Sequence, residues 1–291
     1  MTVSGSPPPQ PEHGVAGELR QDRFVGTKDL ASWPTRFGQL LASLARPIGG
    51  WIGPHAALVV ILVVGMAAVV ALSAVAAQVY DAVTEADGVA GLDQPLLAAA
   101  MSARVPWLNY AATGFTDVAG VIVMPIVAVV VMMILALRRR SWTPVILITA
   151  AGAGSLLMTI AGKRLIGRAR PPLADAIPPY EHSASFPSGH TLNAVVIAGV
   201  IAYLLVLRQR HRTSRVVTIT VAVAFAVTIG ATRVYLGHHW FTDVLAAACL
   251  GAAWLALVIT AHRLYLTTRK SHAPAPAQIT DTDRPKSRQT E

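Results

Sequence analysis

Six long apolar segments constrain the fold of this chain more than any other feature of its sequence. A helix needs about 20 apolar residues to cross the roughly 30 Å hydrocarbon core of a bilayer, and these six segments approach or meet that length. Only 13% of the residues are charged, against about 25% in an ordinary soluble domain. We therefore expect an all-α, polytopic integral membrane protein with six transmembrane helices. The expected spans are Ala56–Val79, Gly120–Leu137, Pro144–Gly162, Thr191–Leu207, Val216–Ala231 and Val244–Leu266. Asp117 either caps the second span or lies inside a helix that begins near Pro106.

Polar tails rich in proline flank the apolar region and set the expected domain boundaries. Residues 1–50 are expected to form a cytoplasmic N-terminal tail, disordered for about its first 30 residues. An interfacial helix should follow in this tail, because apolar residues recur there at helical spacing: Phe37, Leu40, Leu41 and Leu44. Pro47 is expected to end that helix. Residues 51–267 should form the membrane domain, and residues 268–291 a disordered cytoplasmic tail.

Positive charge outside the spans predicts the orientation of the chain. Cytoplasmic loops carry an excess of Lys and Arg, so the basic clusters and both termini should be cytoplasmic. The protein should therefore lie in the cytoplasmic membrane. The same clusters account for most of the Lys and Arg behind the net charge of +9, and for this reason we expect no nucleic-acid partner. One cluster precedes the first span. The other three follow the second, fourth and sixth spans, at Arg138–Arg140, Arg208–Arg215 and Arg263–Lys270 respectively.

One further cluster of cations, in KRLIGRARP, breaks this rule on the side expected to be extracytoplasmic. Lys163, Arg164, Arg168 and Arg170 follow the third span. Cations placed there against the rule suggest a functional requirement, such as holding the phosphate of a lipid headgroup. Alternatively, they are anchors that extend to the headgroup layer. Lys163 and Arg170 are seven residues apart, so both face one side if the helix continues.

A second motif, SFPSGHTLN, lies on the same expected face. Pro187 should begin a helix. The first turn of that helix carries Ser188, Gly189 and His190. Unpaired backbone N–H groups in a first turn favour a bound anion, and an imidazole can exchange a proton near neutral pH. The turn is therefore a candidate anion site.

A third motif, TRVYLGHHWFTD, contains adjacent histidines that helical phase distinguishes. At about 100° per residue, His239 and Asp243 lie within about 40° of each other, whereas His238 and Asp243 differ by about 140°. A carboxylate bonded to one imidazole nitrogen fixes the tautomer and leaves the other nitrogen free as a nucleophile or base. We therefore expect His239 to pair with Asp243 and His238 to have a supporting role. Arg233 can fold back to supply a further cation, whereas Glu181 is interpreted as a solvated loop residue.

Together the three motifs resemble the signature of the type 2 phosphatidic acid phosphatase family, membrane phosphatases related to vanadium haloperoxidases. The family pattern K-x6-R-P, P-S-G-H and S-R-x5-H-x3-D corresponds to Lys163–Pro171, Pro187–His190 and Thr232–Asp243, with Thr where Ser is usual. The resemblance implies that His239 attacks phosphorus to form a phosphohistidine, that Asp243 orients it, and that His190 protonates the leaving oxygen. It also implies a phosphate-binding set: Lys163, Arg170, Ser188, Gly189 and Arg233.

These implications give a concrete expectation for function. The protein should be a metal-independent phosphatase, without a cofactor and inhibited by vanadate, that acts on a lipid phosphate or diphosphate at the outer membrane face. Candidate substrates are polyprenyl diphosphate such as undecaprenyl diphosphate, phosphatidic acid and phosphatidylglycerophosphate. The expected partners are this substrate and membrane lipids; no oligomeric state is predicted. Two alternatives stay open: a zinc-dependent hydrolase using the histidines of this face, and a lipid transporter or scramblase without enzymatic activity.

Overall fold

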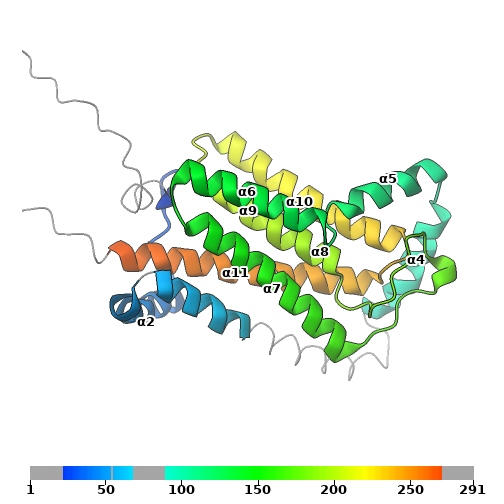
Figure 1. Cartoon of the computed structure of the whole chain (residues 1–291), viewed down its shortest axis with the longest axis horizontal. Coiled ribbons are helices and arrows are strands. Elements are labelled where there is room, and N and C mark those ends of the chain that lie inside the picture. Colours follow the sequence, from blue (N-terminus) through cyan, green and yellow to red (C-terminus); the bar gives the residue numbers. More distant parts are fainter. Residues whose placement is uncertain (1–21, 54, 68–88, 271–291) are drawn as a thin grey trace, which may run out of the picture.

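Long helices run side by side along the longest axis of the molecule (Figure 1). The computed structural model describes residues 22–53, 55–67 and 89–270. The long helices are α6 (Val123–Arg139), α7 (Thr143–Ile166), α10 (Arg212–Tyr235) and α11 (Phe241–Lys270). Within the described residues, four helical stretches are long and apolar enough to cross a membrane, which confirms a helical protein with several candidate spans: Thr143–Ile166, Gly189–Val206, Arg212–Tyr235 and Phe241–Thr268.

The first and second expected spans are not among these four stretches. Helix α6 is 17 residues long, and a turn separates it from α5 (Pro106–Asp117). The second span therefore does not begin near Pro106. The first expected span is described only as the helix at residues 55–67, and its remainder lies outside the described residues. A total of six spans stays a prediction.

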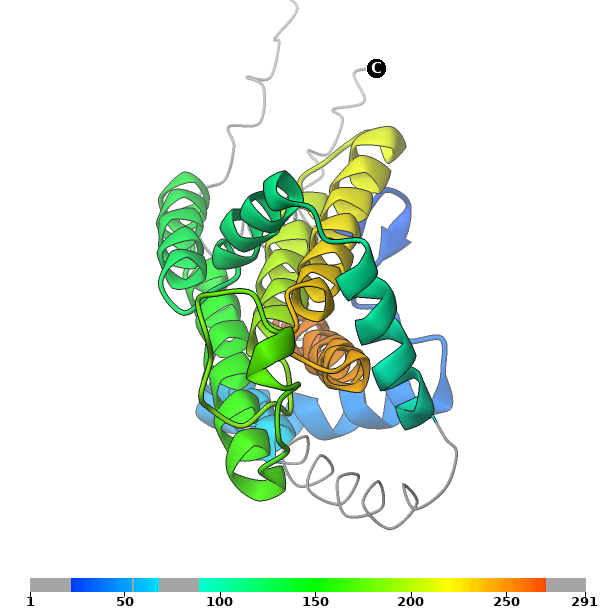
Figure 2. The same cartoon turned by 90° about the vertical axis from the view of Figure 1, so that its right-hand side faces the viewer.

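Helix α11 lies in the middle of the bundle and packs against α7 and α10 (Figure 2). Its Trp254, Val258 and Ala261 are almost completely buried. A small residue on α7 lets the two helices approach closely, because a Cβ atom added at Gly154 would lie 2.2 Å from Trp254 Nε1. The indole N–H of Trp254 donates to the Ala150 carbonyl at 3.3 Å. This central helix thus carries the start of its sequence, including Asp243, to one end of the bundle.

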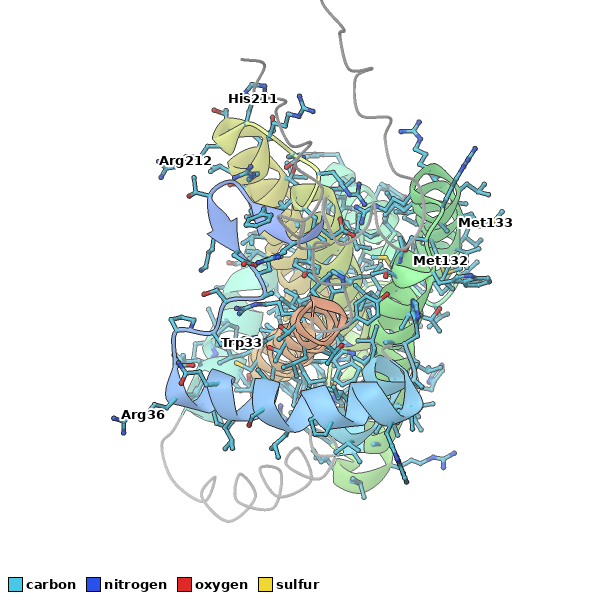
Figure 3. The ribbon with its side chains drawn as sticks, turned by 90° about the vertical axis from the view of Figure 1, so that its left-hand side faces the viewer. Trp33, Arg36, Met132, Met133, His211 and Arg212 are labelled. Carbon is cyan, nitrogen blue, oxygen red and sulfur yellow. The ribbon has the colours of Figure 1, made fainter. Side chains whose placement is uncertain are left out.

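Helix α2 (Arg36–Ile52) crosses the opposite end of the bundle, where Arg36 points away from the molecule and Trp33 lies near α11 (Figure 3). The helix continues through Pro47, so the expectation that Pro47 ends it is wrong. Proline removes only one backbone hydrogen bond, while Ala42 and Ala45 on the preceding turns pack against Leu264 of α11. Its outer side exposes apolar side chains, as an interfacial helix requires: Phe37, Leu40, Leu44 and Trp51.

The chain just before α2 is folded. Strands β1 (Phe24–Val25) and β2 (Lys28–Asp29) form a short antiparallel hairpin. The buried carboxylate of Asp22 pairs with Arg208 at 2.7 Å and with Arg139 at 3.6 Å. The expected disorder of the first 30 residues is therefore wrong for residues 22–30, because the hairpin ties the ends of two helices together; residues 1–21 lie outside the described residues.

All three sequence motifs lie at the end of the bundle where α4 and α5 cover the helix ends (Figure 1). This end comprises η1 (Val89–Leu92), α4 (Asp93–Ser102), α5, and a loop after α7 that contains η2 (Leu173–Asp175). The following helical stretch consists of α8 (Gly189–Asn193), a π-helical turn (Ala194–Ala198) and α9 (Gly199–Val206). π-helical turns often occur near functional sites.

Candidate active site

Lys163 and Arg170 meet on the loop after α7, but not in the way expected. Helix α7 ends at Ile166, and Gly167 adopts a left-handed conformation with φ of 62°. The condition for both residues to lie on one side, a helix that continues to Arg170, is therefore not met, because a glycine in this conformation ends a helix. The two side chains nevertheless converge on Ser183. Lys163 Nζ donates to its hydroxyl at 3.0 Å, and Arg170 Nε donates to its carbonyl at 2.7 Å.

His239 lies in the turn that precedes α11, so the helical geometry used to choose it is absent. Gly237 has a positive φ of 73°, and the helix begins only at Phe241. His239 Nδ1 still faces Asp243, at 3.6 Å from Oδ2, which is longer than a direct hydrogen bond. The hydroxyl of Ser185 spans this gap: it donates to Asp243 Oδ2 at 2.5 Å and lies 3.4 Å from His239 Nδ1. Ser185 therefore connects the carboxylate to the imidazole.

The second imidazole nitrogen of His239 faces a cation. Its Nε2 lies 3.2 Å from Arg170 Nη1, and only 1% of the residue is exposed. Burial and the neighbouring Arg233 and Arg170 lower the pKa of His239 to about 4, although Asp243 acts in the opposite direction. The ring is therefore neutral near pH 7. With Nδ1 protonated toward Ser185, the Nε2 lone pair accepts a hydrogen bond from Arg170 Nη1.

Asp243 is fixed through both of its carboxylate oxygens. Arg168 Nη1 donates to Oδ1 at 2.6 Å, and the backbone N–H of Trp240 donates to Oδ2 at 3.0 Å. The residue is fully buried. A buried carboxylate with this many donors stays ionised and keeps one orientation.

The interpretation of Glu181 as a solvated loop residue is wrong, because its carboxylate pairs with two arginines. Its Oε2 lies 2.7 Å from Arg170 Nη2, and its Oε1 forms a short ion pair with Arg233. Burial alone would raise the pKa of Glu181, but Arg233 and Arg170 lower it to about 2. The carboxylate thus lies between two guanidinium groups predicted to bind phosphate.

His238 points away from Asp243. Its Nε2 donates to the Ile177 carbonyl at 2.7 Å, and only 3% of the residue is exposed. Burial lowers its pKa, so the ring is neutral. It holds the loop that carries Glu181 against the turn before α11.

The PSGH motif opens the α8 helix beside these residues. The hydroxyl of Ser188 caps that helix, accepting from the N–H of Thr191 at 3.5 Å. The backbone N–H of Ser188 donates to the Asp243 carbonyl at 3.3 Å, which docks the motif on α11. His190 follows in the first turn, and Nε2 of its ring would lie 3.5 Å from a Cβ atom added at Gly120.

Three residues of this network were not predicted from the sequence. Ser185 lies two residues before the PSGH motif, and no local pattern in the sequence marks its hydroxyl as a partner of Asp243. Arg168 lies two positions before Arg170 in the RAR stretch. The sequence shows it as one more cation of this cluster and does not reveal that it pairs with Asp243. Asp93 contacts Arg168 at 2.7 Å, but it lies far away in the sequence and outside the three motifs.

The described residues contain no group of three or more His, Cys, Asp or Glu side chains arranged to hold a metal ion. The zinc-dependent alternative therefore has no ligand set in this part of the chain. The positive groups around His239 would also repel a cation.

Comparisons with known proteins agree with the motifs. Residues 142–265 match the model of the PAP2 superfamily. The chain is 36% identical over 177 residues to phosphatidylglycerophosphatase B of Bacillus subtilis (strain 168), covering 59% of this chain and 84% of that protein. It is 32% identical over 126 residues to a lipid A 1-phosphatase of Rhizobium etli, covering 40% and 49%. It also resembles the crystal structure of a transmembrane PAP2 type phosphatidylglycerolphosphate phosphatase from Bacillus subtilis, with a TM-score of 0.55 and 30% identity over 70% of this chain and 93% of that chain. The chain therefore belongs to the PAP2 superfamily and is a membrane phosphatase of lipid phosphates.

Proposed function

We propose that this phosphatase works without a metal, through a phosphohistidine formed on His239 at the outer face of the cytoplasmic membrane. One observation carries the proposal: Nδ1 of His239 faces Ser185 and Asp243, while Nε2 faces Arg170. The Nδ1 proton is held by an acceptor, and the Nε2 lone pair points at an arginine of the predicted phosphate-binding set, whose hydrogen bond an incoming phosphate would take over. This is the arrangement that a nucleophilic imidazole needs.

In the first step, the Nε2 lone pair attacks phosphorus, and the bond from phosphorus to the leaving oxygen breaks. The positive charge that develops on the ring is stabilised by Asp243 through Ser185. His190, in the first turn of α8, donates a proton to the leaving oxygen. Water then attacks phosphorus with His190 as the base, which releases inorganic phosphate and restores the ring.

The phosphate oxygens would be held by the predicted set: the side chains of Lys163, Arg170, Ser188 and Arg233, and the backbone N–H of Gly189. Arg233 is 1% exposed, and its Nε has no hydrogen-bond partner among the described residues. A buried donor without a partner destabilises the folded protein unless a ligand accepts a hydrogen bond from it. Phosphate would replace the carboxylate of Glu181 between the two guanidinium groups. The cations then stabilise the negative charge of the transition state without a metal.

The rest of the substrate requires an apolar environment beside this site. A groove of about 370 Å³ between α6 and α7 reaches Asn193, three residues after His190. It is lined by apolar side chains that include Met124, Ala128 and Ile148, which suits a lipid tail. We propose phosphatidylglycerophosphate as the preferred substrate because the similar curated protein and the similar solved structure, both from Bacillus subtilis, carry that activity in their names; phosphatidic acid and undecaprenyl diphosphate are the competing candidates.

Phosphate release by the purified protein in detergent tests this proposal. The three lipids are compared at equal mole fraction, with and without EDTA and with added vanadate. We expect release that EDTA leaves unchanged and vanadate inhibits, highest with phosphatidylglycerophosphate, and absent in His239→Ala. Activity lost in EDTA and restored by Mg²⁺, or turnover by His239→Ala, would contradict the mechanism; equal rates on all lipids would contradict the substrate.

A further inference from the structure

Arg168 joins two buried carboxylates behind the proposed active site. Its Nη1 lies 2.6 Å from Asp243 Oδ1, and its Nη2 lies 2.7 Å from Asp93 Oδ2. Asp243 is fully buried, and Asp93 is 4% exposed. Both ends of the guanidinium group are therefore occupied by protein, on the Asp243 oxygen that does not face His239.

Thr242 closes this network at the first turn of α11. Its backbone N–H donates to Asp93 Oδ1 at 2.9 Å, and its hydroxyl donates to Asp93 Oδ2 at 2.7 Å. The same hydroxyl lies 2.7 Å from Arg168 Nη1. Asp93, at the start of α4, thus fixes both the arginine and the helix that carries Asp243.

Arg168 also reaches the other oxygen of Asp243, through the backbone. The carbonyl of Arg168 accepts from the N–H of Ser185 at 2.8 Å. The hydroxyl of Ser185 in turn donates to Asp243 Oδ2 and lies next to His239 Nδ1. A displacement of Arg168 would therefore move both contacts on which the orientation of the imidazole depends.

We propose that Asp93 and Arg168 are positioning residues for the phosphatase reaction: they hold the Asp243 carboxylate and Ser185 so that His239 keeps its reactive tautomer and direction. The inference rests on the proposed role of His239 as the nucleophile. It separates Arg168 from the phosphate-binding cations of the same cluster. Arg168 is bonded to two buried carboxylates, those of Asp93 and Asp243, whereas Arg170 and Arg233 share the partly exposed carboxylate of Glu181, which a substrate phosphate can displace.

Kinetics of Arg168→Gln and Asp93→Asn, measured on the full chain in detergent, test this proposal. Misplacing a reacting group by about 1 Å costs about 100-fold in rate, so we expect kcat to fall by about 10- to 100-fold. KM and the inhibition constant for vanadate should change by less than about threefold, because neither residue contacts phosphate. Arg164→Gln is the matched control: this exposed arginine of the same cluster should leave kcat within about twofold of the original value.

A double-mutant cycle separates positioning from a structural role. If Arg168 acts through Asp243, adding Arg168→Gln to Asp243→Asn should lower the residual kcat by less than about threefold further. Losses that multiply, an unchanged kcat in both single variants, or a raised KM and weaker vanadate inhibition with unchanged kcat would each overturn the proposal.

One further variant, Arg168→Lys, keeps the outcome interpretable. It retains the charge, and Asp93→Asn retains an acceptor for the Thr242 N–H, so one of them can report if Arg168→Gln fails to fold. Turnover by His239→Ala would contradict the proposed function itself. An inactive His239→Ala combined with normal kcat in the Asp93 and Arg168 variants would contradict only the positioning roles.

Discussion

Replacing Glu181 by Gln should tighten the binding of phosphate-like anions. The Glu181 carboxylate pairs with Arg170 at 2.7 Å and with Arg233, so an incoming phosphate has to displace it. Glutamine has nearly the same shape and can still accept a hydrogen bond, but it lacks the charge. It should therefore be displaced more easily.

The size of the effect follows from the two contacts of Glu181. A hydrogen bond to a charged group contributes about 1.5–3 kcal/mol. Glutamine has a single acceptor oxygen, so it keeps one of the two contacts and loses the other, which removes about 2 kcal/mol. Solvent reaches 29% of the Glu181 side chain, and we reduce the difference to about 1.4 kcal/mol for screening. This corresponds to about a tenfold lower inhibition constant for vanadate.

Inhibition of phosphate release by vanadate, together with thermal unfolding, measures this change. Without ligand, Glu181→Gln should unfold at a lower temperature, because Arg170 and Arg233 lose the charge that separates them; vanadate should stabilise this variant more than the original protein. Asp175→Asn, in the same loop but without an ion pair to these arginines, is the control. An unchanged or weaker inhibition by vanadate in Glu181→Gln would refute the idea that the carboxylate occupies the phosphate site.

Three further predictions follow from the site. Ser185→Ala should lower kcat about tenfold, the equivalent of one hydrogen bond of about 1.4 kcal/mol, and normal kinetics would show that Asp243 acts on His239 without it. His190→Ala should lose activity on lipid phosphates but recover part of it on p-nitrophenyl phosphate, whose leaving group needs no proton; equal losses on both substrates would contradict its role as the acid. Stability should fall as the pH drops from 6.5 to 4, because unfolded His239 binds a proton that the folded ring, with a pKa of about 4, does not. A further loss below pH 4.5 should follow as Glu181, with a folded pKa of about 2, loses its ion pairs; melting temperatures across this range, with His239→Gln as the comparison, test both statements.

The sequence predicted the helical membrane architecture because apolar length alone determines which segments can span a bilayer. Its errors lie where local signals compete with tertiary contacts. Pro47 does not end α2, since the helix packs on α11 on the preceding turns. Residues 22–30 are polar, but they fold because the Asp22 carboxylate pairs with arginines far away in the sequence.

In the candidate site, too, local sequence predicted some features, whereas tertiary contacts decided the others. Motif spacing selected His239 and Asp243, and the structure brings them together, although through a turn rather than the continuous helix that the phase argument assumed. Gly237 lies at this turn with a positive φ, so the helix begins only after His239. Gly167 likewise ends α7 between Lys163 and Arg170. Asp93 could not be predicted as part of this site, because its contacts with Thr242 span 149 positions of the sequence.

Direct detection of the phosphohistidine tests the central claim of this account. The enzyme is mixed with lipid labelled in its terminal phosphate, quenched with alkali within one turnover, digested and analysed by mass spectrometry. Alkali is used because a P–N bond survives it but is lost in acid. We predict a phosphate group on the peptide containing His239, present in the original protein and absent from His239→Gln. Full turnover without any labelled peptide, or label on a different residue, would contradict the account.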